Sequence, residues 1–271
     1  MSSTTTFEIK GPAGLLSGAE SVPDGPDGAG AVGLPIVLVH GINMSRDVWT
    51  EVAELLSPRH RVVTFDLRGH GRSSKDGPFT ANDYAADTLA VMDALGIERA
   101  HVVGTSFGGS TAAVLASSAP DRVATVASFG GALAVEGLDL DGAIAFIKSV
   151  GVRDFFAAFL PQGSFAPGTD QALLDRALDA ASVGREVDTV IEVTTTALQA
   201  DTTAAAQAVS VPALVVTGEH DMTCPVPAGQ AVAAALRTTH VVMPERGHVV
   251  SMEDPAGVVA LIEQHVAAHD A

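Results

Sequence analysis

The fold of this 271-residue chain is decided by the stretch Ala100-His101-Val102-Val103-Gly104-Thr105-Ser106-Phe107-Gly108-Gly109. Its apolar first half predicts a buried strand over 101–103, and the small residues that follow predict a helix over 108–119. A G-x-S-x-G pattern between a strand and a helix is typical of a tight, strained turn that lifts the serine hydroxyl above the sheet edge. Glycines flank the serine because side chains there would collide with neighbouring backbone. The pattern therefore predicts that Ser106 is an accessible nucleophile.

The segments on either side of this turn alternate between short apolar runs and helical patterns. Strands are predicted at 36–39, 62–66, 101–103, 123–129, 213–217 and 240–243, and helices at 48–56, 82–95, 108–119, 227–236 and 256–268. Two further strands are predicted at 4–10 and 15–22, ahead of a loop rich in Pro, Asp and Gly. This alternation predicts an α/β fold, with a mostly parallel central sheet and helices on both faces. Thr80 or Asn82 is the expected N-cap of the second helix.

The segment 132–209 interrupts this alternation. It contains no clear buried strand, and its amphipathic patterns predict helices at 140–150, 152–160, 171–181 and 187–200. We interpret it as a helical lid or cap inserted between two strands. The expected organisation is a core domain made of 1–131 and 210–271, with the lid or cap insertion at 132–209.

Composition and charge narrow the class of protein and its partners. Apolar residues make up 47% of the chain, enough for a sizeable core, and the formal net charge is −17. An acidic surface argues against nucleic acid and anionic membranes as partners, because phosphates are bound by clusters of Lys and Arg. The single cysteine, Cys224, excludes an intramolecular disulfide, and no signal segment or membrane-length apolar run is visible. We expect a soluble cytoplasmic protein, either a monomer or a homodimer.

A serine hydroxyl is a poor nucleophile at neutral pH and needs a base, usually histidine, that a carboxylate orients. Asp221 follows the predicted strand 213–217, at the sheet edge where open α/β sheets place their sites. His248 follows the last predicted strand, 240–243, in a loop before the final helix. The chain order of these candidates is Ser106, Asp221, His248.

Other residues compete for the two partner roles. For the acid they are Glu219 and two acids early in the insertion, Glu136 and Asp139; for the base they are His220, His240, His265 and His269. His265 and His269 lie on the exposed face of a predicted helix, and His240 begins a strand. His220 adjoins Asp221 in sequence and is expected to point elsewhere.

An acyl-transfer site also needs two backbone N–H groups aimed at the oxyanion of the tetrahedral intermediate. One is expected from Phe107, which follows the serine. The other is expected from Ile42, in the loop His40-Gly41-Ile42 after the strand 36–39. His40 and His70 are expected to be structural residues that hydrogen-bond loop backbone.

These motifs together resemble the α/β-hydrolase fold superfamily, in the branch of small bacterial esterases and lactonases. The resemblance spans nearly the whole chain and rests on Val39-His40-Gly41 with Trp49 following, Asp66-Leu67-Arg68-Gly69-His70-Gly71-Arg72-Ser73, the turn at Ser106, Gly218 to Asp221, and Gly247-His248. It implies a Ser106–His248–Asp221 triad. Subgroups of similar appearance are enol-lactone hydrolases, simple carboxylesterases and cofactor-free perhydrolases.

Departures from other branches narrow the expected chemistry. The loop His40-Gly41-Ile42-Asn43-Met44 lacks the Gly-Gly-rich form of hormone-sensitive-lipase-like esterases, and the elbow Gly-Thr-Ser-Phe-Gly differs from the Gly-Asn-Ser pattern of carbon–carbon bond hydrolases. A serine nucleophile counts against haloalkane dehalogenase and epoxide hydrolase activity.

We expect a serine hydrolase that cleaves a small-molecule carboxylic ester or lactone and needs no cofactor. No metal-ligand spacing and no dinucleotide or Walker fingerprint occurs. Three alternatives stay open on the same triad: carbon–carbon or amide bond hydrolysis, perhydrolysis, and a ligand-binding receptor of the hydrolase fold with little turnover.

Several residues of the insertion are open to two interpretations. Its phenylalanines are Phe146, Phe155, Phe156, Phe159 and Phe165, and we expect most to pack internally and one or two to line an apolar pocket. Lys148, Arg153 and Arg185 are expected at solvated surface positions, with a substrate carboxylate as the alternative partner of one of them. Cys224 is expected to be a small packed thiol.

Overall fold

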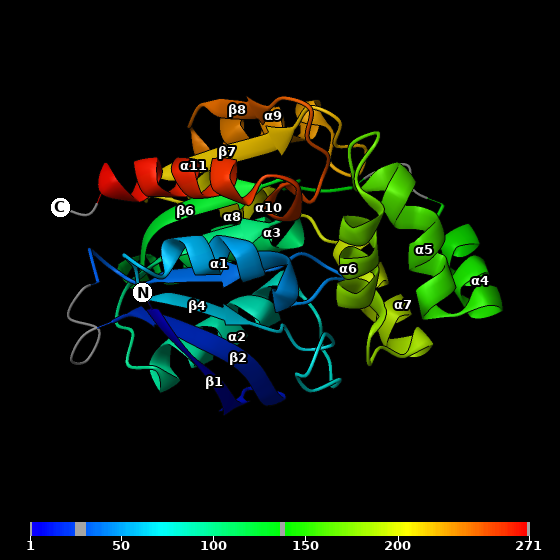
Figure 1. The fold of residues 1–271 in the computed structure, drawn as a ribbon, viewed down its shortest axis with the longest axis horizontal. Helices are drawn as coiled ribbons and strands as arrows, with labels where there is room; N and C mark the ends of the chain where they lie inside the picture. The colour runs from blue at the N-terminus through cyan, green and yellow to red at the C-terminus, as the bar shows by residue number, and fades with distance from the viewer. Residues whose placement is uncertain (1, 25–30, 136–138, 270–271) are drawn as a thin grey trace.

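The structure is a computed structural model that describes residues 2–24, 31–135 and 139–269. Its centre is an eight-stranded sheet in the order β1-β2-β4-β3-β5-β6-β7-β8 (Figure 1). The strands are β1 (Ser2–Gly11), β2 (Gly14–Pro23), β3 (Ile36–Val39), β4 (Val62–Phe65), β5 (Ala100–Thr105), β6 (Val123–Phe129), β7 (Ala213–Gly218) and β8 (His240–Met243). From β4 onward the pairs are parallel, whereas β1 and β2 form an antiparallel hairpin on the β4 edge. The predicted α/β fold is confirmed.

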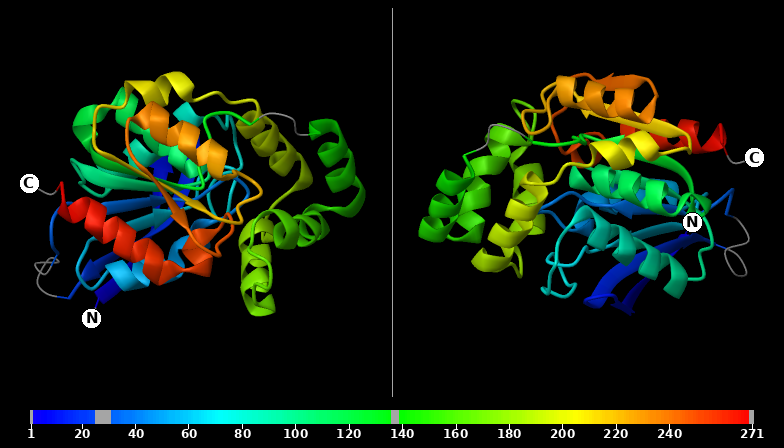
Figure 2. Two further views of the ribbon diagram at one scale, coloured as in Figure 1. Left: turned by 90° about the horizontal axis from the view of Figure 1, so that it is seen from above. Right: turned by 180° about the vertical axis from the view of Figure 1, so that it is seen from behind.

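Helices cover both faces of this sheet (Figure 2). One group contains α1 (Thr50–Leu56) and α11 (Pro255–Ala267), which pack together, and the other contains α2 (Ala81–Ala94), α3 (Phe107–Ser118) and α9 (Val226–Leu236). Within the part of the chain that the structure describes, no helix is both long and apolar enough to cross a bilayer.

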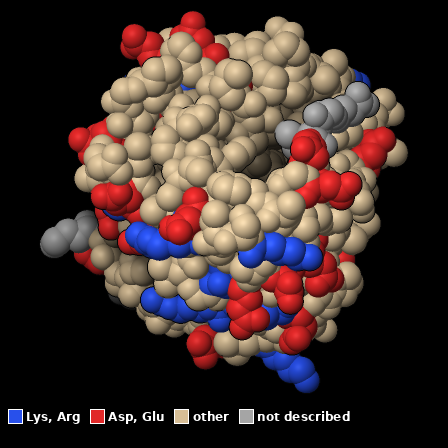
Figure 3. Space-filling view, turned by 90° about the vertical axis from the view of Figure 1, so that its right-hand side faces the viewer, with Lys and Arg blue, Asp and Glu red and all other residues tan. Residues whose placement is uncertain are grey.

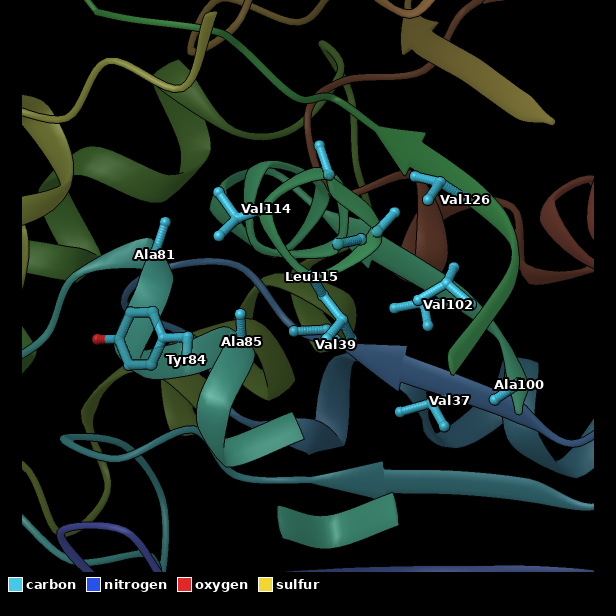
Figure 4. Close-up of a cluster of buried hydrophobic side chains, with 14 of the residues drawn as sticks. Val37, Val39, Ala81, Tyr84, Ala85, Ala100, Val102, Val114, Leu115 and Val126 are labelled. Carbon is cyan, nitrogen blue, oxygen red and sulfur yellow. The ribbon is translucent and has the colours of Figure 1, made fainter. Parts of the chain in front are cut away.

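The strands are buried on both faces because their side chains alternate between two apolar clusters. On β3, Val37 and Val39 join the cluster beneath α2 and α3, whereas Ile36 and Leu38 join the cluster beneath α1 and α11. Figure 4 shows the first of these clusters, with Val102 of β5 close to Leu115 of α3. A continuous apolar run therefore encodes a central parallel strand.

The element boundaries differ from the sequence prediction in a few places. The N-cap of α2 is Thr80 and not Asn82, because Thr80 and Asp83 form a reciprocal capping box. The predicted helix 48–56 is a 3-10 turn, Arg46–Trp49, followed by α1. The short helix α10 (Val250–Glu253), which follows the His248 loop, has no periodic pattern in the sequence and was not predicted.

Between β6 and β7 the described residues form five helices. They are α4 (Leu140–Val150), α5 (Val152–Gly163), α6 (Gln171–Ser182), α7 (Val187–Leu198) and α8 (Thr203–Ala208). The helices α4 to α7 lie beyond the carboxyl ends of the parallel strands (Figure 1). By contrast, α8 packs against α3 and α9. The division of the chain into core and lid domains stays a prediction, and we call α4 to α7 the helical insertion.

The turn after β4 is held by a buried ion pair. Arg68 donates to both carboxylate oxygens of Asp87 on α2, at 2.7 and 2.6 Å, and both side chains are almost fully buried. The backbone N–H groups of Arg46 and Arg72 donate to Asp66, at 2.9 and 3.0 Å. These hydrogen bonds hold the turn after β4 against α2 and against the backbone at Arg46. The motif from Asp66 to Ser73 therefore has a structural role.

Removing the carboxylate of Asp87 leaves the buried guanidinium of Arg68 with Asp83, at 3.7 Å, as its remaining acidic partner. We expect Asp87→Ala to lower the free energy of unfolding by about 3–5 kcal/mol, measured by urea denaturation. The matched control is Asp93→Ala, which removes an exposed ion pair with Arg122 at 2.6 Å and is expected to cost less than about 1 kcal/mol. Equal losses in the two variants would contradict this account of the turn.

Candidate active site

Ser106 sits between β5 and α3 in a strained backbone conformation, with φ 53° and ψ −127°. Non-glycine residues seldom adopt a positive φ, so the surrounding structure has to hold it. A Cβ atom on Gly104 would lie 2.1 Å from the backbone of Gly108, and one on Gly108 would lie 2.4 Å from the carbonyl oxygen of Val39. The two glycines therefore allow the strand–turn–helix packing that holds Ser106 in this conformation.

Asp221 and His248 meet at the carboxyl end of the sheet. The Nδ1 atom of His248 lies 2.8 Å from Oδ2 of Asp221, and the two residues are 7% and 2% exposed. The other oxygen of Asp221 accepts hydrogen bonds from the backbone N–H groups of Thr223 (2.9 Å) and Cys224 (2.7 Å). These donors keep the carboxylate oriented toward the imidazole.

Ser106 and His248 line one cavity of about 590 Å³, together with Gly41, Ile42 and Phe107. A Cβ atom on Gly41 would lie 2.7 Å from Cβ of Ser106, so the loop after β3 passes directly against the serine. Figure 3 shows a hollow on the side of the molecule that carries the helical insertion. Four of the five predicted site residues thus line one cavity, and the fifth, Asp221, is bound to His248.

Asn43 connects the loop after β3 to the helical insertion. Its Nδ2 group donates to Oγ1 of Thr194 on α7 at 2.8 Å, and its Oδ1 accepts from Nη2 of Arg185 at 3.0 Å. Asn43 has φ 62°, in the left-handed region that asparagine tolerates. We call Asn43, Thr194 and Arg185 the Asn43 bridge. The sequence analysis missed this bridge because Thr194 and Arg185 both lie more than 140 residues from Asn43 in the sequence.

Arg185 is buried and has no carboxylate partner among the described residues. It is 8% exposed, and its Nε and Nη1 atoms have no hydrogen-bond partner among the described residues. Burial lowers its pKa to about 10. The expected solvated position for Arg185 is therefore wrong, because the chain before α7 folds it inward against Asn43.

His40 and His70 bond to backbone, as predicted. Nε2 of His40 accepts from the N–H of Leu67 at 2.9 Å, and Nε2 of His70 accepts from the N–H of Asn43 at 3.1 Å. Burial lowers the pKa of both imidazoles, that of His70 well below its ordinary value. Both rings are thus neutral supports of the loops around Ser106.

Neutral buried histidines make stability depend on pH. Because the folded pKa of His40 and His70 lies below 6.5, the unfolded chain takes up protons first on acidification. Their contribution to stability is complete above about pH 7 and is lost below about pH 6.5, by up to about 1.4 kcal/mol per histidine and pH unit. Urea denaturation between pH 8 and pH 5 measures this loss. His70→Gln should flatten the slope, and a slope equal to that of wild type would contradict the assignment.

The competing acids and bases have other contacts. Glu219 accepts from the N–H of Glu245 at 2.9 Å, and Asp139 caps α4 by accepting from the N–H of Gly142 at 2.9 Å. His240 bonds to Thr217 at 2.9 Å, and His220 is exposed. His265 and His269 lie at the end of α11 with their rings 5.0 Å apart. Glu136 lies outside the described residues.

Cys224 is buried beside Asp221 and also lines the cavity. Burial, together with the charge of Asp221, raises the pKa of its thiol to about 12. A thiol that stays protonated at neutral pH is a weak nucleophile. The structure thus agrees with the expected packed thiol. No cluster of His, Cys, Asp and Glu among the described residues has the geometry of a metal site.

Comparison with known proteins identifies the family. The model of the alpha/beta hydrolase fold matches residues 35–255, most of the chain. The protein therefore belongs to the alpha/beta hydrolase fold family, as the resemblance of its motifs implied.

Individual relatives match over shorter stretches. The chain is 39% identical over 100 residues to the putative carbamate hydrolase RutD of Azorhizobium caulinodans, covering 36% of this chain and 38% of that protein. It is 35% identical over 158 residues to the rhodomycin D methylesterase DauP of Streptomyces sp. strain C5, covering 54% and 53%. The matches thus span about a third to a half of the length of these curated relatives.

Solved structures of similar fold cover nearly the whole chain. The enol-lactonase from Burkholderia xenovorans LB400 superimposes with a TM-score of 0.86 at 24% identity, covering 96% of this chain and 100% of that one. The thermophilic esterase from Thermogutta terrifontis gives 0.84 at 22% identity, covering 98% and 100%. At these identities the likeness establishes the fold.

Proposed function

We propose that this protein is a serine hydrolase that cleaves a carboxylic ester or a lactone. The observation that carries the proposal is the convergence of a strained Ser106 and a carboxylate-bound His248 on one cavity. Family membership and relatives named methylesterase and carbamate hydrolase support hydrolysis of an acyl bond. The proposed reaction uses no cofactor.

The proposed roles start from the contact between His248 and Asp221. The Nδ1–H group of His248 donates a hydrogen bond to Asp221, which leaves Nε2 free to take the proton of Ser106. The Ser106 oxygen attacks the acyl carbon, and the N–H groups of Ile42 and Phe107 stabilise the oxyanion. The imidazolium then gives its proton to the leaving alcohol. His248 next activates a water molecule, which releases the acid and frees Ser106.

We propose that the helical insertion acts as a cap over this centre. Its helices α4, α5 and α7 line the cavity beside Ser106 and His248. Walls of this kind select the substrate and keep bulk water from the acyl-enzyme.

Steady-state hydrolysis of a small panel of substrates tests the function. The panel holds short and long aryl esters, a γ-lactone, an enol lactone and a vinylogous diketone. We expect turnover of esters or lactones. Cleavage of the diketone alone would reassign the chain to carbon–carbon bond hydrolysis, and tight ligand binding without turnover would contradict an enzymatic role.

The Asn43 bridge should support the proposed oxyanion donor. Asn43→Gly keeps a backbone that tolerates positive φ but removes the amide bonds to Thr194 and Arg185. Ile42, whose N–H group is the proposed oxyanion donor, directly precedes Asn43 in the chain. Loss of the bridge should therefore misplace this donor, and we expect kcat to fall about 10-fold or more, with less change in KM. Thr194→Val, which removes one of the two bonds, should give a smaller loss. Wild-type kcat in Asn43→Gly would contradict this role.

A further inference from the structure

The described residues that line the cavity carry almost no charged side chains. Besides His248 and Cys224, the one residue with an ionisable side chain among its described lining residues is Asp139. Asp139 is exposed and already accepts a hydrogen bond from the N–H of Gly142 at 2.9 Å. Figure 3 shows uncharged residues on the left of the hollow and above it, with acidic residues on its right-hand side. No Lys or Arg of the described chain lines the cavity.

The basic residues of the helical insertion are engaged or point elsewhere. Arg153 is bound to Asp179 at 2.8 Å on the surface, and Lys148 is exposed outside the cavity lining. Arg185 reaches Asn43 and does not line the cavity. None of the three can neutralise a substrate carboxylate inside the cavity.

Aromatic rings form one wall of this cavity. Phe155 on α5 lies at the centre of the wall, with ring centroids 6.0 Å from Phe146, 5.1 Å from Phe156 and 6.4 Å from Phe159. All four rings line the cavity. Phe146 and Phe159 are 44% and 45% exposed. Met222, which also lines the cavity, is 73% exposed. Large apolar side chains left exposed around a cavity are typical of a surface that a ligand covers.

We propose that this cavity selects uncharged esters or lactones with a bulky apolar, ring-bearing half, and that it discriminates against substrates with a carboxylate on that half. The inference rests on the proposed function and narrows its substrate class. A bulky apolar group gains binding by covering the aromatic wall, since rings attract rings beyond the effect of buried area. A carboxylate in the same place loses its hydration and finds no cation.

Matched substrates test both halves of this statement. The first set holds p-nitrophenyl esters of acetic acid, 4-phenylbutanoic acid and 4-(4-carboxyphenyl)butanoic acid, so that the aryl group lies on the acyl half. The second set holds acetate esters whose alcohol carries the same two arylbutyl groups, so that the aryl group lies on the alcohol half. In at least one set we expect kcat/KM for the uncharged aryl substrate to exceed that for its carboxylated partner by about 100-fold or more. Equal or higher kcat/KM for the carboxylated partner in both sets would overturn the inference while leaving the proposed function intact. A wild-type protein that hydrolyses neither these esters nor the lactones of the panel above would contradict the proposed function itself.

Variants of the aromatic wall test whether this wall determines the preference for the uncharged substrate. Phe159→Arg places a guanidinium at a half-exposed wall position near the end of α5. We expect it to reduce the preference for the uncharged partner about 10-fold or more relative to Phe159→Gln, which removes the ring without adding charge. The same preference in both variants would overturn the placement of the substrate against this wall.

A second pair of variants tests the contribution of the rings. Phe155→Ala removes the central ring and should lower kcat/KM for the 4-phenylbutanoate ester about 10-fold relative to the acetate ester. Val150→Ala, on α4 outside the cavity lining and 37% exposed, should leave that ratio at the wild-type value. A wild-type ratio in Phe155→Ala, with normal folding, would overturn the aromatic wall as the selecting surface.

Discussion

Ser106→Ala is expected to lower kcat/KM for ester hydrolysis by about 10⁴-fold or more while the fold stays intact. The alanine retains the small side chain that the turn accommodates but has no oxygen to form the acyl-enzyme. The cavity, His248 and the proposed oxyanion donors remain, so substrate binding should persist. Parallel circular dichroism and thermal melts establish that the variant is folded.

The matched control for this variant is Ser117→Ala, on the same helix α3 but outside the cavity lining. Ser117 donates to the carbonyl oxygen of Val114 within the helix, so its removal should leave hydrolysis near the wild-type rate. Retention of most activity in a pure, folded Ser106→Ala sample would remove the basis for a serine mechanism.

Asp221→Asn is expected to lower kcat by about 10³–10⁴-fold with a small effect on folding. The oxygen of the new amide can still accept from the N–H groups of Thr223 and Cys224. Its NH₂ group then faces Nδ1 of His248 in place of the carboxylate oxygen at 2.8 Å. That donor selects the imidazole tautomer with its proton on Nε2, which cannot accept the proton of Ser106.

Glu219→Gln is the control for this prediction, because Glu219 lies two residues earlier and is exposed. Its carboxylate binds only the N–H of Glu245 among the described contacts, so we expect activity within about twofold of wild type, as for most surface substitutions. Comparable losses in the two variants would contradict the assignment of Asp221 as the orienting carboxylate.

The features that sequence analysis predicted well are those encoded by local patterns. Continuous apolar runs marked β3 and β6 with their observed boundaries, and the glycines around Ser106 marked the turn between β5 and α3. The position of Asp221 beside His248 followed from a general property of parallel sheets, whose carboxyl ends share one edge. Their catalytic roles stay predictions.

The features that sequence analysis could not reach depend on contacts between distant segments. Arg185 looked like a surface residue because nothing near it in sequence indicates that it folds against Asn43. Phe156 and Phe159 are three residues apart on α5, yet Phe156 is buried and Phe159 is half exposed. Which rings line the cavity is decided by how α4 and α5 pack over the sheet edge, and no local pattern specifies that packing.

Reaction of the intact protein with a fluorophosphonate, followed by mass spectrometry of its peptides, tests the serine mechanism most directly. The reagent phosphonylates a serine only where a base and an oxyanion site activate it. The account predicts one adduct per chain, located on Ser106, together with complete loss of ester hydrolysis. An adduct on another residue, or full hydrolysis by a protein that carries the adduct on Ser106, would contradict it.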